Sequence, residues 1–177
     1  MTRRTVTIGL VIAICVQVCV LVGMQVQAAL PLWTGTEVRV KTVPVDPRSL
    51  FRGNYAILRY DTDHVLPDLE AHVSDLRHGD VVYIGLAPDS EGLHNWTGAS
   101  LTPPESGLYV RARVHRLMTR VLASPIGVTI PNIEAFFAPK QKALQMERDL
   151  RNGGVAVLMV AANGSVAIKD VEVLPAD

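Results

Sequence analysis

The chain has 177 residues, the size of one ordinary domain, and its 17 basic and 17 acidic side chains give a net charge of zero. That balance argues against a nucleic-acid-binding protein, which carries a basic excess on its binding face. Apolar residues make up 49% of the chain and the mean hydropathy is +0.25, so the composition excludes a disordered chain and predicts a membrane segment.

A membrane-spanning helix is predicted at the N-terminus. Arg3 and Arg4 are followed by a stretch without charged residues up to Glu37, and residues 6–24 within it are almost entirely apolar. At about 1.5 Å per residue, this segment is long enough to cross a hydrocarbon core of roughly 30 Å. The two arginines predict that the N-terminus stays in the cytoplasm and that the remainder is exported. We therefore expect a single-pass protein of the cytoplasmic membrane that contacts the bilayer through residues 6–24.

A cleaved signal peptide is the alternative interpretation of this segment. Val26-Gln27-Ala28 is an acceptable cleavage signal, with cleavage after Ala28. However, the apolar stretch is longer than the roughly 7–15 residues usual in secretory signals. We therefore favour a retained anchor over residues 1–30, ended by Pro31, and a periplasmic or extracellular domain over residues 31–177.

The exported part is predicted to be one α+β domain in which antiparallel strands dominate. Residues 36–43 alternate with period two, which places Val38 and Val40 on a buried face and charged residues on the other. Further strands are predicted over residues 55–60, 81–86, 108–115, 127–130, 155–161 and 166–173, with weaker candidates at 93–99 and 117–123.

Two helices and a closing hairpin complete the predicted domain. A helix is predicted over residues 67–78, which begin with a proline and carry apolar residues along one face. A second is predicted over residues 139–152, between another proline and a glycine. Asn163-Gly164 predicts the turn of the closing hairpin. A slip in the alternation of its last strand predicts a bulge near Lys169 and Asp170.

One segment carries a recognisable motif. Residues 42–60 read TVPVDPRSLFRGNYAILRY, which resembles the GDYXXLXY family of bacterial membrane-anchored proteins. The glycine, tyrosine, leucine and tyrosine of the family's motif are matched by Gly53, Tyr55, Leu58 and Tyr60, while Asn54 stands in place of the aspartate. The resemblance extends over nearly the whole chain. It implies a functionally uncharacterised protein, of a kind often encoded beside multi-pass membrane proteins.

The charged residues of this segment allow two interpretations. Asp46, Arg48 and Arg52 lie on the loop that enters the predicted strand, and an Asp–Arg pair that locks this corner explains them without a ligand. We favour that interpretation. In the alternative, Arg48 and Arg52 form a fork for a carboxylate, a phosphate head group or an acidic loop of a partner. The candidate binding residues are therefore Asp46, Arg48, Arg52, Gly53, Asn54, Tyr55, Leu58 and Tyr60.

The strand that follows the loop has two distinct faces. Tyr55, Ile57 and Arg59 share one face, and Leu58 and Tyr60 lie on the other. We predict that Leu58 and Tyr60 belong to the core, with the Tyr60 hydroxyl reaching a polar partner at its rim.

Patterns typical of catalysis or metal binding are weak. The acidic residues and histidines between Asp61 and His72 could offer ligands to a hard metal, but their spacing fits no metal motif, and a solvated surface is the better interpretation. The basic stretch between Arg111 and Arg120 is likewise interpreted as a solvated strand face. The sequence therefore assigns no catalytic residue, metal or cofactor.

We expect a non-enzymatic binding module that acts with a multi-pass membrane protein. Two alternatives stay open. One is a membrane-tethered hydrolase, with a layout faintly similar to signal peptidases and Ser49 paired with a lysine. The other is an envelope sensor that holds its ligand with Arg48 and Arg52. The oligomeric state is not indicated by the sequence.

Overall fold

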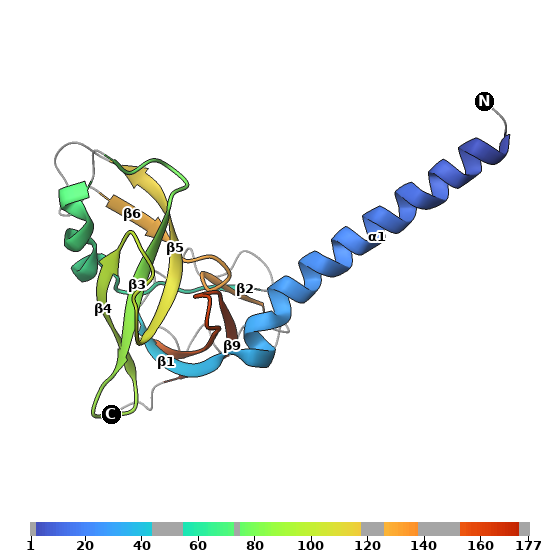
Figure 1. Ribbon diagram of the computed structural model, residues 1–177. Helices are drawn as coiled ribbons and strands as arrows, with labels where there is room; N and C mark the ends of the chain where they lie inside the picture. The colour runs from blue at the N-terminus through green and yellow to red at the C-terminus, as the bar shows by residue number, and fades with distance from the viewer. Residues whose placement is uncertain (1–2, 44–54, 73–74, 118–125, 138–152, 174–177) are drawn as a thin grey trace.

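The computed structural model describes residues 3–43, 55–72, 75–117, 126–137 and 153–173 (Figure 1). Its elements are α1 (Arg3–Thr34), β1 (Thr36–Thr42), β2 (Tyr55–Ile57), the 3₁₀ helix η1 (Asp63–His72), β3 (Val81–Pro88), β4 (His94–Ser100), β5 (Leu108–Leu117), β6 (Ile126–Thr129), β7 (Ala135–Phe137), β8 (Gly154–Val160) and β9 (Val166–Val173). The predicted α+β class, with an apolar N-terminal helix and antiparallel sheets, is confirmed.

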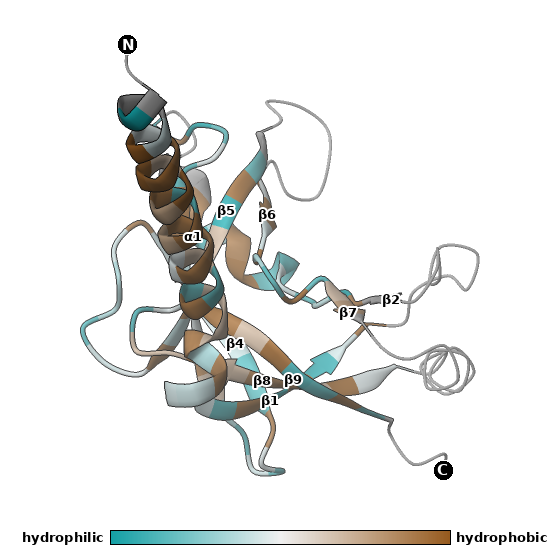
Figure 2. Ribbon diagram, turned by 90° about the vertical axis from the view of Figure 1, so that its right-hand side faces the viewer, coloured by the Kyte–Doolittle hydropathy of each residue, from teal (hydrophilic) through white to brown (hydrophobic). Residues whose placement is uncertain are grey.

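Helix α1 projects from the β-rich domain and is apolar along almost its whole length (Figures 1 and 2). Residues 7–34 are long and apolar enough to cross a membrane. The apolar side chains from Ile8 to Met24 do not pack on the domain, and Val11, Val18 and Met24 are each at least half exposed. Apolar surface of this extent is stable only in a nonpolar surrounding, so α1 has the properties of a membrane anchor.

The prediction that Pro31 ends this helix is wrong. The helix continues to Thr34, and the Gly35 amide donates to the Pro31 carbonyl at 2.9 Å. Pro31 lacks the N–H that would have reached the carbonyl of Gln27, and in the final turn this loss does not stop the helix. Gly35 then lets the helix end approach β8, because a Cβ there would lie 2.4 Å from the Pro31 carbonyl oxygen and 2.9 Å from the Val160 amide nitrogen.

The described strands form three antiparallel sheets, ordered β1-β8-β9, β2-β7 and β4-β3-β5-β6. Strand β1 pairs with β8 along its full length, which joins the first and last parts of the β-rich domain. Strand β8 also pairs with β9, where Val157 faces Asp170 and Leu158 faces Ile168. Lys169 therefore has no opposite residue, and the predicted bulge is confirmed.

One apolar cluster connects the sheets. Strand β1 contributes Val38 and Val40, which are buried as the alternation predicts. The four-stranded sheet contributes mainly β-branched residues from β3 and β5, such as Val82 and Val110. Each buried side chain of this size stabilises the fold by about 1.5–3 kcal/mol relative to an exposed one, so burial of this cluster is the main force that holds the sheets together.

The helix expected over residues 67–78 lies earlier and is tighter than predicted. It is the 3₁₀ helix η1, over Asp63–His72, and Pro67 is in its interior. The side chains of Leu66 and Leu69 are both almost completely buried. Their spacing of three residues places them on one face of a 3₁₀ helix, which has three residues per turn. The short strand β7 was not predicted, and the predicted helix over 139–152 lies outside the described residues.

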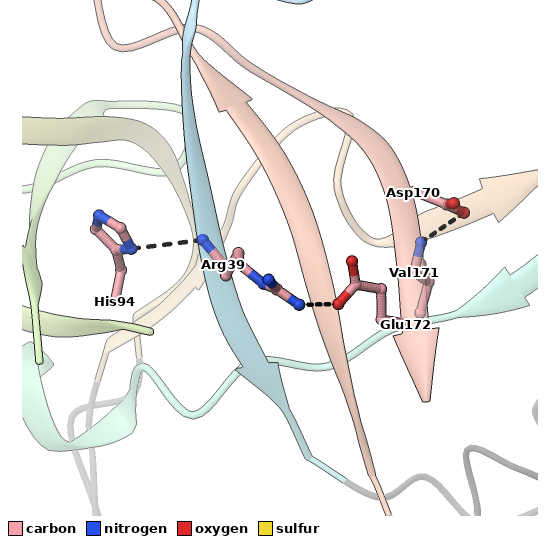
Figure 3. A network of polar contacts seen from close by, with 5 residues as sticks. All are labelled: Arg39, His94, Asp170, Val171 and Glu172. Atoms are coloured by element: carbon pink, nitrogen blue, oxygen red, sulfur yellow. Dashed lines mark hydrogen bonds and ion pairs between the residues drawn. The ribbon is translucent and has the colours of Figure 1, made fainter. Parts of the chain in front are cut away.

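The solvent face of β1 is lined with ion pairs. Lys169 donates to Glu37 at 2.6 Å, Arg39 pairs with Glu172 (Figure 3), and Lys41 is 3.7 Å from Glu91. Hydrogen bonding and charge from Lys169 lower the pKa of Glu37 below its usual value. Water screens such exposed pairs, so they contribute little to stability. On this sheet each of these cations is thus matched by a carboxylate.

Candidate functional site

Much of the predicted binding segment lies outside the described residues. This applies to Asp46, Arg48, Arg52, Gly53 and Asn54. The proposed arginine fork and the alternative Asp–Arg corner therefore stay predictions. The structure does place the motif's later part, from Tyr55 to Tyr60.

The motif strand is held on both sides by other parts of the chain. Strand β2 pairs antiparallel with β7, with Tyr55 opposite Phe137. Beyond β2, the Leu58 amide donates to the Glu134 carbonyl at 2.9 Å. On the other side, the Val43 amide donates to the Arg59 carbonyl at 2.9 Å. The motif therefore links the end of β1 to the segment that contains β7.

Leu58 and Tyr60 point into the protein, as predicted. Leu58 is buried in the apolar cluster, and the Tyr60 ring packs edge-on against Trp96 with a centroid separation of 6.0 Å. The Tyr60 hydroxyl donates to the Ile133 carbonyl at 2.9 Å, which is the expected polar partner at the rim. Burial, and secondly the charge of Glu134, raise the pKa of Tyr60 far above its ordinary value. These contacts give both motif residues a structural role.

A polar pocket of about 570 Å³ lies beside the motif strand. It is bounded by Leu58–Tyr60, the start of η1, strand β6 and the end of β5. Of the described residues, four with ionisable side chains besides the phenol line it, namely Arg59, Asp63, His115 and Glu134. His115 Nδ1 lies 3.1 Å from the Thr129 hydroxyl. With cationic and anionic groups at one opening, this motif pocket can accept a polar ligand or a mixed-charge loop of another protein.

The candidate metal ligands are only partly assembled. His64 Nδ1 lies 3.8 Å from an Asp61 carboxylate oxygen, and His64 Nε2 contacts the Trp96 carbonyl at 3.1 Å. The side chains of Glu70 and His72 are outside the described set. Within the described part of the chain, no three His, Cys, Asp or Glu side chains come close enough together to hold a metal ion.

Sequence reasoning missed the partners that position the motif. Ile133 and Glu134 supply the carbonyls that receive the Tyr60 hydroxyl and the Leu58 amide, but neither side chain is required for these bonds. The one local signal was the aromatic pair Phe136-Phe137, which favours a strand. A strand as short as β7 gives no alternation from which its pairing with β2 could be inferred.

Replacing Tyr60 by phenylalanine is expected to lower the free energy of unfolding by about 1–2 kcal/mol at neutral pH, because the Ile133 carbonyl loses its donor. The difference between wild type and Tyr60→Phe should shrink above about pH 10, where tyrosine in the unfolded chain ionises. Since folding raises the pKa of Tyr60, the stability linked to its neutral form is present below that pH and is lost as pH rises toward the folded-state pKa.

Denaturant titration of the full chain in detergent, repeated from neutral to alkaline pH, measures this difference. Tyr109→Phe is the matched control, because it removes a hydroxyl that donates to another backbone carbonyl, that of Ala162, at a more exposed site. A gap between wild type and Tyr60→Phe that stays constant over the alkaline range would contradict the burial of this phenol.

Comparison with known proteins places the chain in a family. The model of a protein family described as GDYXXLXY protein matches residues 17–171, from the middle of α1 to β9. Neither the curated proteins nor the solved structures contain a match to the chain.

Proposed function

The chain belongs to the GDYXXLXY family, and on that premise we propose that it is a single-pass membrane-anchored binding module. Its domain lies on the extracytoplasmic side, periplasmic in a bacterium with two membranes. There it acts with a multi-pass membrane protein. The function is binding rather than catalysis.

The observation that carries this proposal is the solvent-exposed apolar surface of α1. Side chains from Ile8 to Met24 stay out of the domain, whereas the helix end near Pro31 and Gly35 packs on it. A helix with this division of contacts is suited to hold a folded domain next to a bilayer. Arg3 and Arg4 precede the apolar stretch, which supports an orientation with the N-terminus in the cytoplasm.

The motif pocket is the surface we assign to the partner. Its charged rim includes Arg59, Asp63 and Glu134, so a loop with charges of both signs would complement it. The implied partner is a multi-pass membrane protein, because family members are often encoded beside such proteins. Its connecting loops would lie at the same membrane surface as the domain.

Site-specific photo-crosslinking in native membranes tests this proposal. A photoreactive residue in place of Asp63, at the rim of the motif pocket, is expected to capture one multi-pass membrane protein. The same group in place of the exposed Asn95, on β4, serves as the control. Identical products from both positions, or no product from Asp63, would reject the partner assignment.

An envelope sensor for a small polar ligand is the second candidate, and the volume and mixed charge of the motif pocket favour it. In that case a small molecule from envelope extracts would raise the melting temperature of the wild type, and Glu134→Gln would abolish the effect. Labelling by a serine-hydrolase probe would instead support the membrane-tethered hydrolase.

A further inference from the structure

A second, smaller pocket lies where the anchor meets the domain. It has a volume of about 200 Å³ and is separate from the motif pocket. Gln27 of α1 lines one side, and Arg111 and Arg113 of β5 line another. Asn132 and Ser165, from two turns, contribute further polar groups. We call this the anchor pocket.

The wall formed by the β8–β9 turn is held firmly against β5. The Arg111 amide donates to the Gly164 carbonyl at 2.9 Å, and the Tyr109 hydroxyl donates to the Ala162 carbonyl at 3.1 Å. Gly164 has a φ of 77°, and a Cβ there would lie 2.6 Å from the Tyr109 ring and 2.9 Å from Arg111 Cγ. Only glycine allows this approach, so the turn is fitted to the stem of Arg111.

The anchor pocket carries positive charge without a matching carboxylate. Arg111 and Arg113 are two residues apart on β5 and therefore share a face. Among the residues that the structure describes, no acidic side chain lines the pocket. Within the described ranges, neither guanidinium has a carboxylate at salt-bridge distance, although Arg113 donates to the Gly79 carbonyl at 3.3 Å. The cations of β1 are paired with carboxylates, whereas the two arginines of the anchor pocket have no such pair among the described residues. The anchor pocket is therefore open to an anion.

The position of Gln27 on α1 places the anchor pocket at the membrane surface. The apolar run ends at Met24, and Gln27 lies about 4.5 Å farther along the helix axis. The polar head-group layer is roughly 5–7 Å thick on each side of the hydrocarbon core. The domain packs on the helix just beyond this point, where Pro31 is buried. A polar domain does not enter hydrocarbon, so the pocket opens at the depth of the lipid phosphates.

We propose that the anchor pocket binds the phosphate of an anionic phospholipid from the bilayer that holds α1. A guanidinium can give two parallel hydrogen bonds to a phosphate, and two arginines at this depth also neutralise the negative charge of the lipid. Bound lipid would fix the domain's orientation relative to the membrane. The inference rests on the membrane anchoring in the proposed function, but not on the identity of a protein partner.

Native mass spectrometry of the full chain in nanodiscs tests this inference. With equal phosphatidylglycerol and phosphatidylcholine, the wild type is expected to retain mainly phosphatidylglycerol. Arg111→Gln with Arg113→Gln should lower the ratio of the two retained lipids about 30-fold, because each cation near a membrane surface contributes about fivefold, or about 1 kcal/mol. Arg39→Gln with Lys41→Gln removes the same charge from β1 and should leave the ratio unchanged.

Asn132→Asp is a second variant that keeps both arginines. Asn132 has a φ of 70°, a conformation that aspartate also tolerates, and the new carboxylate should lower the ratio by repelling the lipid phosphate. No enrichment in the wild type, or equal enrichment in all variants, would overturn the inference. So would loss of enrichment in millimolar inorganic phosphate, which would identify free phosphate as the ligand.

Alkaline carbonate extraction distinguishes failure of the lipid-binding inference from failure of membrane anchoring. A wild-type chain that is released by carbonate would refute membrane anchoring itself. A chain that resists extraction but shows no lipid preference would refute only the lipid site.

Discussion

Replacing Ile14 and Val18 by aspartate is expected to remove the chain from the carbonate-resistant membrane fraction. Both side chains are about half exposed on α1 and lie near the middle of the apolar run. An aspartate at the centre of a membrane helix costs roughly 2.5–3.5 kcal/mol, and each replaced side chain also loses its own favourable transfer, so the pair costs about 6–8 kcal/mol. No other described helix is apolar enough to replace this one.

The matched control places the same charges outside the apolar run. Gln25→Asp with Ala28→Asp keeps residues 6–24 unchanged, and acidic residues have little influence on orientation. This variant should stay in the membrane fraction. If both double variants resist carbonate extraction equally, α1 does not anchor the chain through its apolar run.

Leu58→Ala is expected to lower the free energy of unfolding by about 2–5 kcal/mol. Leu58 is 4% exposed and lies in the cluster that joins the sheets, so truncation leaves a cavity as well as losing buried apolar surface. Chemical denaturation of the full chain in detergent measures the change. The prediction tests whether the motif leucine, one of the candidate binding residues, has a structural role.

Leu101→Ala provides the comparison for this variant, because Leu101 is an exposed leucine and its truncation leaves no cavity. Its effect should be within about 0.5 kcal/mol of zero. Crosslinking from Asp63 should persist in Leu58→Ala under conditions where that protein is folded. Normal stability with lost crosslinking would instead assign Leu58 to the binding surface.

The elements predicted correctly are those whose signals lie within a few residues. The alternation of Val38 and Val40 reports the buried face of β1, and Asn163-Gly164 reports the turn of the closing hairpin. The bulge at Lys169 is indicated by a slip in the alternation of apolar residues along β9. Each of these depends on side-chain direction along one strand, which sequence periodicity records.

The errors arise where tertiary contacts override local preference. Pro31 reads as a helix end, but the final turn continues because Gly35 can pack against β8. The helix expected from Pro67 begins at Asp63 instead, since burial of Leu66 and Leu69 favours three residues per turn. Local sequence rules therefore misplace both the end of α1 and the start of η1.

The two pockets could be predicted only in part. The motif identified Leu58 and Tyr60, yet Glu134 and His115 reach the same pocket from distant parts of the chain. In the anchor pocket, Arg111 and Arg113 belong to a basic stretch that the sequence indicates as a solvated strand face. Their proximity to Gln27 depends on how the β8–β9 turn docks on β5, and sequence spacing carries no information on that contact.

Labelling of a single cysteine tests most directly whether the chain is a retained anchor with an extracytoplasmic domain. The protein carries Ser106→Cys at an exposed position, with Cys15 and Cys19 replaced by serine. In right-side-out membrane vesicles, a membrane-impermeant maleimide is expected to label a chain that still contains residues 1–30. Labelling only after the vesicles are opened, or a labelled chain that begins at Ala29, would contradict this account.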